Sequence, residues 1–132
     1  QDMEYWQQVR RRYPDAPLNY RGFFSTHEMQ LILGRAQALL VTPKWVEAFG
    51  LVVVEALACG VPVITYRRGG PAEIIENGKT GWVIPADNVE ELAKAIERIP
   101  QIDRNVCRQT VETQYSLAVM AQQFRVWTDA LL

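Results

Sequence analysis

The 132-residue sequence is poor in the residues that hold metals and disulfides. It contains one histidine, His27, and two cysteines, Cys59 and Cys107, which lie far apart and form no CxxC pair. A structural zinc site needs about four such ligands at close spacing, so the composition argues against a metal. Two separated cysteines inside apolar segments are typical of small buried residues in a reducing compartment.

Strong charge of one sign and long apolar runs are also lacking. The 14 Lys and Arg residues nearly balance the 15 Asp and Glu residues, and the formal net charge is −1. That balance provides no electrostatic attraction for nucleic acid. No apolar run reaches the roughly 18 residues of a membrane span, and no signal-peptide pattern opens the chain. These absences predict a soluble, cytoplasmic protein that binds no nucleic acid.

Short apolar runs alternate with helical patterns along most of the chain. Continuous apolar runs of this length are typical of parallel strands buried on both faces. We expect strands at 18–24, 38–43, 61–66 and 81–84. Helices are expected at 2–13, 26–36, 49–59, 71–76, 89–99 and 116–132, with Ser25 and Ser116 as N-caps, Gly60 as a left-handed terminator and Pro71 in a first turn. The order predicts an α/β fold with a Rossmann-like parallel sheet and flanking helices.

The domain organisation follows from the same order. Residues 1–132 are expected to form a single domain, in which 101–132 is a C-terminal helical segment. Within that segment one apolar helix face is expected to pack against the fold: Leu117, Met120, Ala121, Phe124, Trp127 and Leu131. A helix precedes the first expected strand, and no strand leads into it. We therefore expect the chain to be part of a larger domain.

Ligands of open parallel sheets collect beyond the carboxyl ends of the strands. Three loops leave strand ends here, at 23–25, 43–50 and 67–70. The middle loop leads into a helix whose first turn offers unpaired amides and the positive end of the dipole, which suit an anion. Gly50 allows a ligand to approach the backbone there. Trp45 is expected either to cover a pocket or to cap this loop.

Glu55 lies between Val54 and Ala56 in an otherwise apolar helix. An ionised carboxylate is costly to bury without partners. A vicinal diol such as a ribose would satisfy both of its oxygens. Arg67 or Arg68 would serve equally well as protein partners, and a further alternative is that the helix is less buried than its composition suggests; the sequence leaves these interpretations open.

Residues 42–85 carry an E-x7-E pattern within FGL…EA…G.PV, followed by GG..E.I..G.TG. This stretch resembles the signature of retaining glycosyltransferase family 4, the group 1 glycosyltransferases, and a weaker similarity extends over 18–99. The matching residues are Glu47, Phe49, Gly50, Leu51, Glu55, Ala56, Gly60, Pro62, Val63, Gly69, Gly70, Glu73, Gly78, Thr80 and Gly81.

The resemblance implies the carboxyl-terminal, donor-binding domain of a GT-B enzyme and assigns roles to individual residues. Glu47 would be catalytic, contacting donor-sugar hydroxyls close to the reacting carbon, and Glu55 would bind ribose. Backbone amides would contact the sugar and diphosphate at Phe49, Gly50, Leu51 and Val52, and the base would lie near Phe23 and Phe24. The family usually has serine where this chain has Lys44, which is either a substitute phosphate ligand or a solvated loop lysine. No metal is implied.

The implied function is transfer of a hexosyl group, with retention, from a UDP-, GDP- or ADP-linked sugar. The acceptor, a sugar or a lipid, would be bound by an N-terminal domain absent from these 132 residues, so the isolated chain is expected to be inactive. A full-length enzyme would act in the cytoplasm or at the cytosolic face of a membrane. Strands missing between 18–24 and 38–43 would leave an open sheet edge and favour self-association. The alternatives are a non-catalytic scaffold domain and a sugar phosphorylase or epimerase of similar fold.

Overall fold

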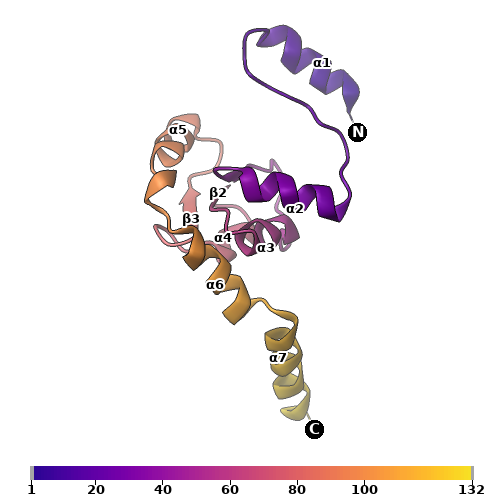
Figure 1. Ribbon diagram of the computed structural model, residues 1–132, viewed down its shortest axis with the longest axis vertical. Coiled ribbons are helices and arrows are strands. Elements are labelled where there is room, and N and C mark those ends of the chain that lie inside the picture. The colour runs from indigo at the N-terminus through magenta and orange to yellow at the C-terminus, as the bar shows by residue number, and fades with distance from the viewer. Residues whose placement is uncertain (1, 132) are drawn as a thin grey trace.

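Three short parallel strands lie at the centre of the computed structural model, which describes residues 2–131 (Figure 1). They are β1 (Leu39–Val41), β2 (Val63–Tyr66) and β3 (Gly81–Ile84), in the order β1-β2-β3. Leu39 pairs with Val63, which pairs with Gly81 on the other side. The expected α/β class and its parallel sheet are confirmed.

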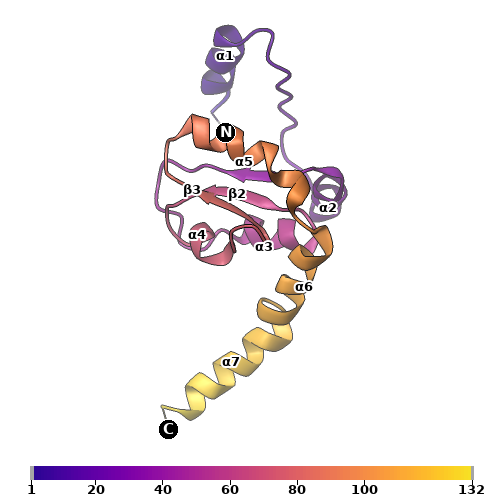
Figure 2. The same ribbon diagram turned by 90° about the vertical axis from the view of Figure 1, so that its left-hand side faces the viewer.

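Helices connect and cover the strands. α2 (Thr26–Arg35) leads into β1, α3 (Leu51–Ala58) joins β1 to β2, and α4 (Pro71–Ile74) joins β2 to β3. α5 (Val89–Glu97), a 3-10 turn (Ile99–Gln101) and α6 (Arg104–Gln114) follow. Figure 2 shows α5 and α3 on opposite sides of the strands. The expected N-cap Ser25 is present and forms a capping box with Glu28, and Gly60 is left-handed as expected, at φ +69°.

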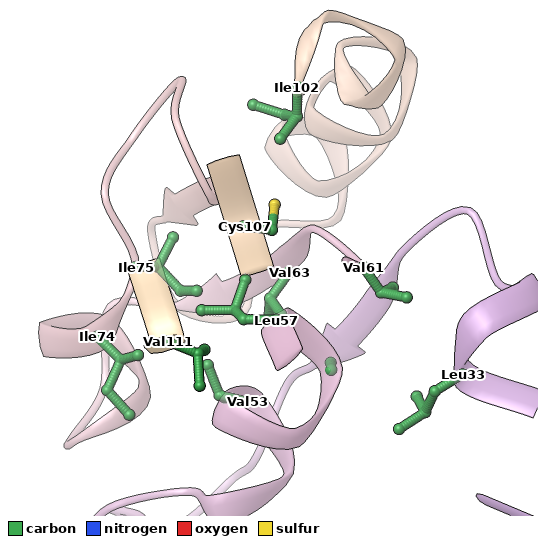
Figure 3. Packing of buried hydrophobic residues seen from close by; sticks show 11 residues of the cluster. Leu33, Val53, Leu57, Val61, Val63, Ile74, Ile75, Ile102, Cys107 and Val111 are labelled. Carbon is green, nitrogen blue, oxygen red and sulfur yellow. The ribbon is translucent and has the colours of Figure 1, made fainter. Parts of the chain in front are cut away.

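β2 is the central strand, and its side chains alternate between two clusters. Val63 belongs to the larger cluster with Val53, Leu57 and Cys107, which joins α3 and α6 to the sheet (Figure 3). Ile64 belongs to a second cluster, packed against α5. All four β2 residues are buried, as expected of a strand covered on both faces. In β1 that expectation is wrong, because Leu40 is 45% exposed at the edge of the sheet.

The expected strand at 18–24 is not formed. The segment runs as irregular chain between the first helix and α2, and Leu18, Tyr20 and Phe23 are exposed. A strand requires a hydrogen-bonded neighbour, and within residues 2–131 β1 pairs only with β2. Residues 18–24 do not pair with the open edge of β1, so their apolar pattern forms no strand.

The two terminal helices stand apart from the sheet (Figures 1 and 2). α1 (Met3–Arg12) is capped by Asp2 and α7 (Leu117–Asp129) by Ser116, yet neither helix has a buried residue. The expected packing of the α7 apolar face is wrong for this part of the chain, since its large side chains are more than half exposed: Leu117, Met120, Phe124, Trp127 and Leu131. Amphipathic sequence is a local property, whereas its burial depends on a partner surface.

Cys107 makes the stability of the core depend on pH. Burial raises the pKa of its thiol to about 11, from an ordinary value of 9.0. The folded protein therefore keeps the thiol protonated at a pH where the unfolded chain ionises. Its stabilising contribution is complete below about pH 9 and declines from there to about pH 11. Each pKa unit corresponds to about 1.4 kcal/mol.

We expect urea unfolding to show a free energy that falls over this interval, by about 2 kcal/mol from this thiol. Cys107→Ala should lower the free energy of unfolding at every pH, but this free energy should then decrease less steeply as the pH rises. Cys59→Ala is the control, since Cys59 is only half-buried, and it should retain the fall. An equal pH slope in the native protein and Cys107→Ala would contradict the assignment.

Candidate functional site

The loops that follow β1 and β2 touch through their main chains. The Gly70 amide donates to the Glu47 carbonyl at 2.8 Å, and Glu47 and Gly69 form an isolated parallel bridge. A Cβ atom on Gly69 would overlap the Glu47 carbonyl oxygen, and one on Gly70 would overlap that of Ala48. The glycine pair therefore allows the two loops to meet at backbone distance, which fixes the main chain of Glu47.

Arg68 adds a side-chain link between the same strand ends. Its guanidinium donates to the Pro43 carbonyl and to Asp87 Oδ2, both at 2.7 Å. The loops after β1, β2 and β3 are thereby joined at one edge of the sheet. Because this side chain is occupied there, the interpretation of Arg68 as the partner of Glu55 is wrong.

Glu47 is half-buried and lines a hollow beside β1. The indole Nε1–H of Trp45 donates to Glu47 Oε2 at 3.1 Å. We call this the Glu47 hollow, and its walls come from β1, the loop after it, the start of α3 and α1: Tyr5, Leu39, Leu40, Val41, Thr42, Pro43, Lys44, Trp45, Glu47, Gly50 and Val52. The structure thus brings four of the expected site residues together: Lys44, Glu47, Gly50 and Val52.

Glu55 is exposed, because α3 turns Val53, Ala56 and Leu57 toward the core instead. The idea that it needs a partner because it is buried is therefore wrong. Its carboxylate forms no ion pair within residues 2–131. It lines a second hollow, the Glu55 hollow, between α2, α3 and α6: Phe24, Thr26, Met29, Gln30, Leu33, Glu55, Ala58, Cys59 and Arg108.

The N-terminus of α3 lies between these two glutamates in sequence. Its N-cap is Gly50 in the left-handed conformation, φ +82°, and no side chain caps the helix. By contrast, Ser25, Asn88 and Asp103 cap α2, α5 and α6 through side-chain oxygens. The Val53 amide donates to the Gly50 carbonyl at 2.9 Å, so the amides of Leu51 and Val52 are left for another acceptor, at the positive end of the helix dipole.

The remaining residues expected at the site lie in different parts of the structure. Phe24 lies in the Glu55 hollow, whereas Phe23 is 87% exposed and lines neither hollow. Phe49 and Leu51 face a third hollow, where the Phe49 ring meets Tyr115 edge-on at 6.5 Å between centroids. Burial, together with the charges of Glu76 and Glu73, raises the Tyr115 pKa.

Arg108 and Tyr115 are site-lining residues that the sequence analysis missed. Both belong to the α6 region, more than fifty positions beyond Glu55, and no local pattern links them to it. Among residues 2–131 no group of three His, Cys, Asp or Glu side chains is placed to share a metal ion. No helix in the same range combines the length and apolar composition that crossing a membrane requires.

Residues 16–115 match the family model of glycosyl transferases group 1, which is well over half of the 132 residues. The chain therefore belongs to this family, and its sheet is of the Rossmann-like kind found in GT-B glycosyltransferases.

Two relatives show the extent of the sequence similarity. A sucrose synthase of Thermosynechococcus vestitus is 35% identical over 96 residues, covering 67% of this chain and 12% of that protein. A D-inositol 3-phosphate glycosyltransferase of Rhodococcus erythropolis is 42% identical over 65 residues, covering 49% of this chain and 15% of that protein. The chain thus spans a small fraction of the proteins it matches.

Solved structures share the fold at lower identity. Anabaena HepE in complex with UDP-glucose superposes with a TM-score of 0.82 at 19% identity, covering 98% of this chain and 38% of HepE. Sucrose-phosphate synthase of Thermosynechococcus elongatus gives 0.79 at 24% identity, covering 97% of this chain and 34% of that one.

Gly70→Ala tests whether backbone contact between the loops holds Glu47 in place. Gly70 has ordinary helical angles, φ −55° and ψ −39°, so the added methyl group acts only by displacing residues 48 and 49. We expect a loss of about 2–3 kcal/mol in urea unfolding. Gly34→Ala is the control, because its Cβ would meet nothing within 4 Å, and it should be neutral or stabilising by up to about 1 kcal/mol. Equal stability of the two variants would show that the close contact is not required.

Proposed function

We propose that this chain is the donor-binding part of a retaining glycosyltransferase that transfers a sugar from a nucleotide sugar to an acceptor. The observation that carries the proposal is the placement of Glu47 and Glu55, which are eight positions apart. Each lines its own hollow, and α3 or its N-cap Gly50 contributes to both hollows. The uncapped N-terminus of α3 separates the two glutamates along the chain. A nucleotide sugar has three parts in the same order: a diol-bearing nucleoside, a diphosphate and a sugar.

The nucleoside is assigned to the Glu55 hollow. The unpaired Glu55 carboxylate can accept hydrogen bonds from both hydroxyls of a ribose. Beside it the hollow presents the apolar side chains of Phe24, Met29 and Leu33, which suit the face of a base. Phe23 is not part of this assignment, because it is almost fully exposed.

The diphosphate is assigned to the first turn of α3 and the sugar to the Glu47 hollow. Amides of residues 50–52 would donate hydrogen bonds to the phosphate oxygens and stabilise their negative charge without a metal. Lys44 lies in the Glu47 hollow and would add a positive charge. Glu47 would accept hydrogen bonds from sugar hydroxyls, next to the carbon that reacts. UDP-glucose is the first donor to test, since HepE, which has the same fold, forms a complex with it.

The proposed reaction exchanges one bond of the sugar for another. The bond from the anomeric carbon to the phosphate oxygen breaks, and an acceptor oxygen forms its bond to the same face of that carbon. The acceptor proton moves to the departing phosphate oxygen, whose charge the α3 amides stabilise. The acceptor, a sugar or a lipid, would be bound by an N-terminal domain outside these residues. The 132 residues alone should therefore bind the donor and transfer nothing.

Calorimetric titration with UDP, GDP and ADP, and then with the matching nucleotide sugar, tests the proposal. We expect Glu55→Ala to weaken nucleotide binding by about 1.5–3 kcal/mol, the range for hydrogen bonds to a charged group. Glu47→Ala should leave the nucleotide affinity unchanged and reduce only the affinity that the sugar adds. In the full-length enzyme it should lower turnover.

Glu97→Ala, an exposed residue of α5, is the control and should bind like the native chain. Identical behaviour of the Glu47 and Glu55 variants would contradict the two roles. Saturable binding to none of the nucleotides would contradict the donor site and favour a scaffold. Sedimentation of the same samples should show self-association, which we propose because one edge of β1 is unpaired within residues 2–131.

A further inference from the structure

The side chain of Trp45 is too exposed to serve as part of the hydrophobic core. Trp45 lies two residues before Glu47, and its side chain is 65% exposed. A tryptophan that contributes to the core buries most of its large surface, but neither core cluster includes Trp45. Its specific interaction is polar: Nε1–H donates to Glu47 Oε2 at 3.1 Å. Both residues line the Glu47 hollow.

The main chain and the side chain of Glu47 are held by different partners. Its main chain is fixed by Gly69 and Gly70, through the bridge and the 2.8 Å hydrogen bond. That contact does not set the side-chain torsions. Within residues 2–131, the hydrogen bond to its carboxylate comes from the Trp45 indole. A glutamate side chain with no such restraint samples several rotamers, and ordering it at the moment of binding is costly.

We propose that Trp45 is a positioning residue for Glu47. Its indole N–H holds Oε2 and so restricts the carboxylate to one orientation in the Glu47 hollow. A carboxylate has about four acceptor sites on its two oxygens, so Oε1 stays free to accept from hydroxyls of the donor sugar. The ligand class is a neutral hexosyl group of a nucleotide sugar. This inference rests on the proposed function, because it concerns the sugar in that same hollow.

Trp45→Phe removes the N–H donor and keeps an aromatic ring in the hollow wall. The quantity to measure is the ratio of affinities for the nucleotide sugar that the native 132-residue chain binds and for the corresponding nucleoside diphosphate. We expect Trp45→Phe to reduce this ratio by about three- to tenfold, the cost of ordering one flexible side chain on binding. Affinity for the nucleoside diphosphate alone should not change. Trp127→Phe, at 58% exposure on α7, is the matched control and should change neither value.

A double-mutant cycle separates positioning from an independent contact. If Trp45 acts through Glu47, the double variant Trp45→Phe/Glu47→Ala should have the same affinity ratio as Glu47→Ala alone. Additive losses would show that the indole contacts the sugar by itself and would overturn the positioning role. A Trp45→Phe chain with a native ratio would overturn it as well.

The hydrogen bond can be observed without any ligand. In a 15N-labelled chain, the indole signal that disappears in Trp45→Phe belongs to Trp45. We expect Glu47→Ala to shift this signal and to leave the other indole signals in place, and we expect Glu97→Ala to shift none. An unmoved Trp45 signal in Glu47→Ala would overturn the inference and leave the proposed function standing. If the native chain binds no nucleotide, the proposed function fails, and the sugar-positioning role fails with it.

Discussion

The main-chain contact between Gly70 and Glu47 is the constraint on which the rest of the site depends. Parallel strands end at one edge of a sheet, but loops that leave them can diverge from there. Here the two loops are drawn together because residues 69 and 70 have no side chains to keep the carbonyls of Glu47 and Ala48 away. Glu47, the left-handed Gly50 and the first turn of α3 then follow in sequence from one fixed point.

The contact links the site to the best-packed part of the molecule. β2 is fully buried, and α3 and α6 pack together on one of its faces. Glu55 lies on the outer side of α3, and Glu47 lies in the loop that leads into it, so the core holds the main chain of both residues. The terminal helices contribute no buried residue, and α7 leaves a wide apolar face in solvent. The chain thus combines a well-packed centre with ends whose apolar surfaces are not covered by residues 2–131.

Local features were predictable from the sequence, because short segments determine them. The capping box at Ser25, Gly60 after α3, Pro71 at the start of α4 and the buried strand β2 all follow from residues within a few positions. The prediction of a strand at 18–24 was wrong because a strand depends on a neighbouring strand, and none lies beside this segment within residues 2–131. The exposure of Glu55 could have been read from the helical spacing of Val53, Ala56 and Leu57, which marks the buried face of α3.

The site itself was predictable only in part. The structure has Glu47 in the loop before α3, Gly50 at its N-cap and Glu55 within it, which is where the sequence predicts them, whereas their roles stay predictions. The E-x7-E pattern gave no sign of Arg108 or Tyr115, which reach the site because α6 packs on α3. Nor did it show that Trp45 donates to Glu47, because that depends on the conformation of a loop fixed from elsewhere by Gly69 and Gly70.

Hydrogen exchange of the Gly70 amide measures the central contact most directly. If this amide donates to the Glu47 carbonyl in a stably formed contact, its protection from exchange should be close to that of the hydrogen-bonded amides of β2. Both kinds of amide should exchange only when the carboxyl ends of the strands separate. Exchange as fast as that of the exposed Gly22 amide would contradict the account. Glu47 would then belong to a mobile loop, and the two hollows would not be held in a fixed relation by this contact.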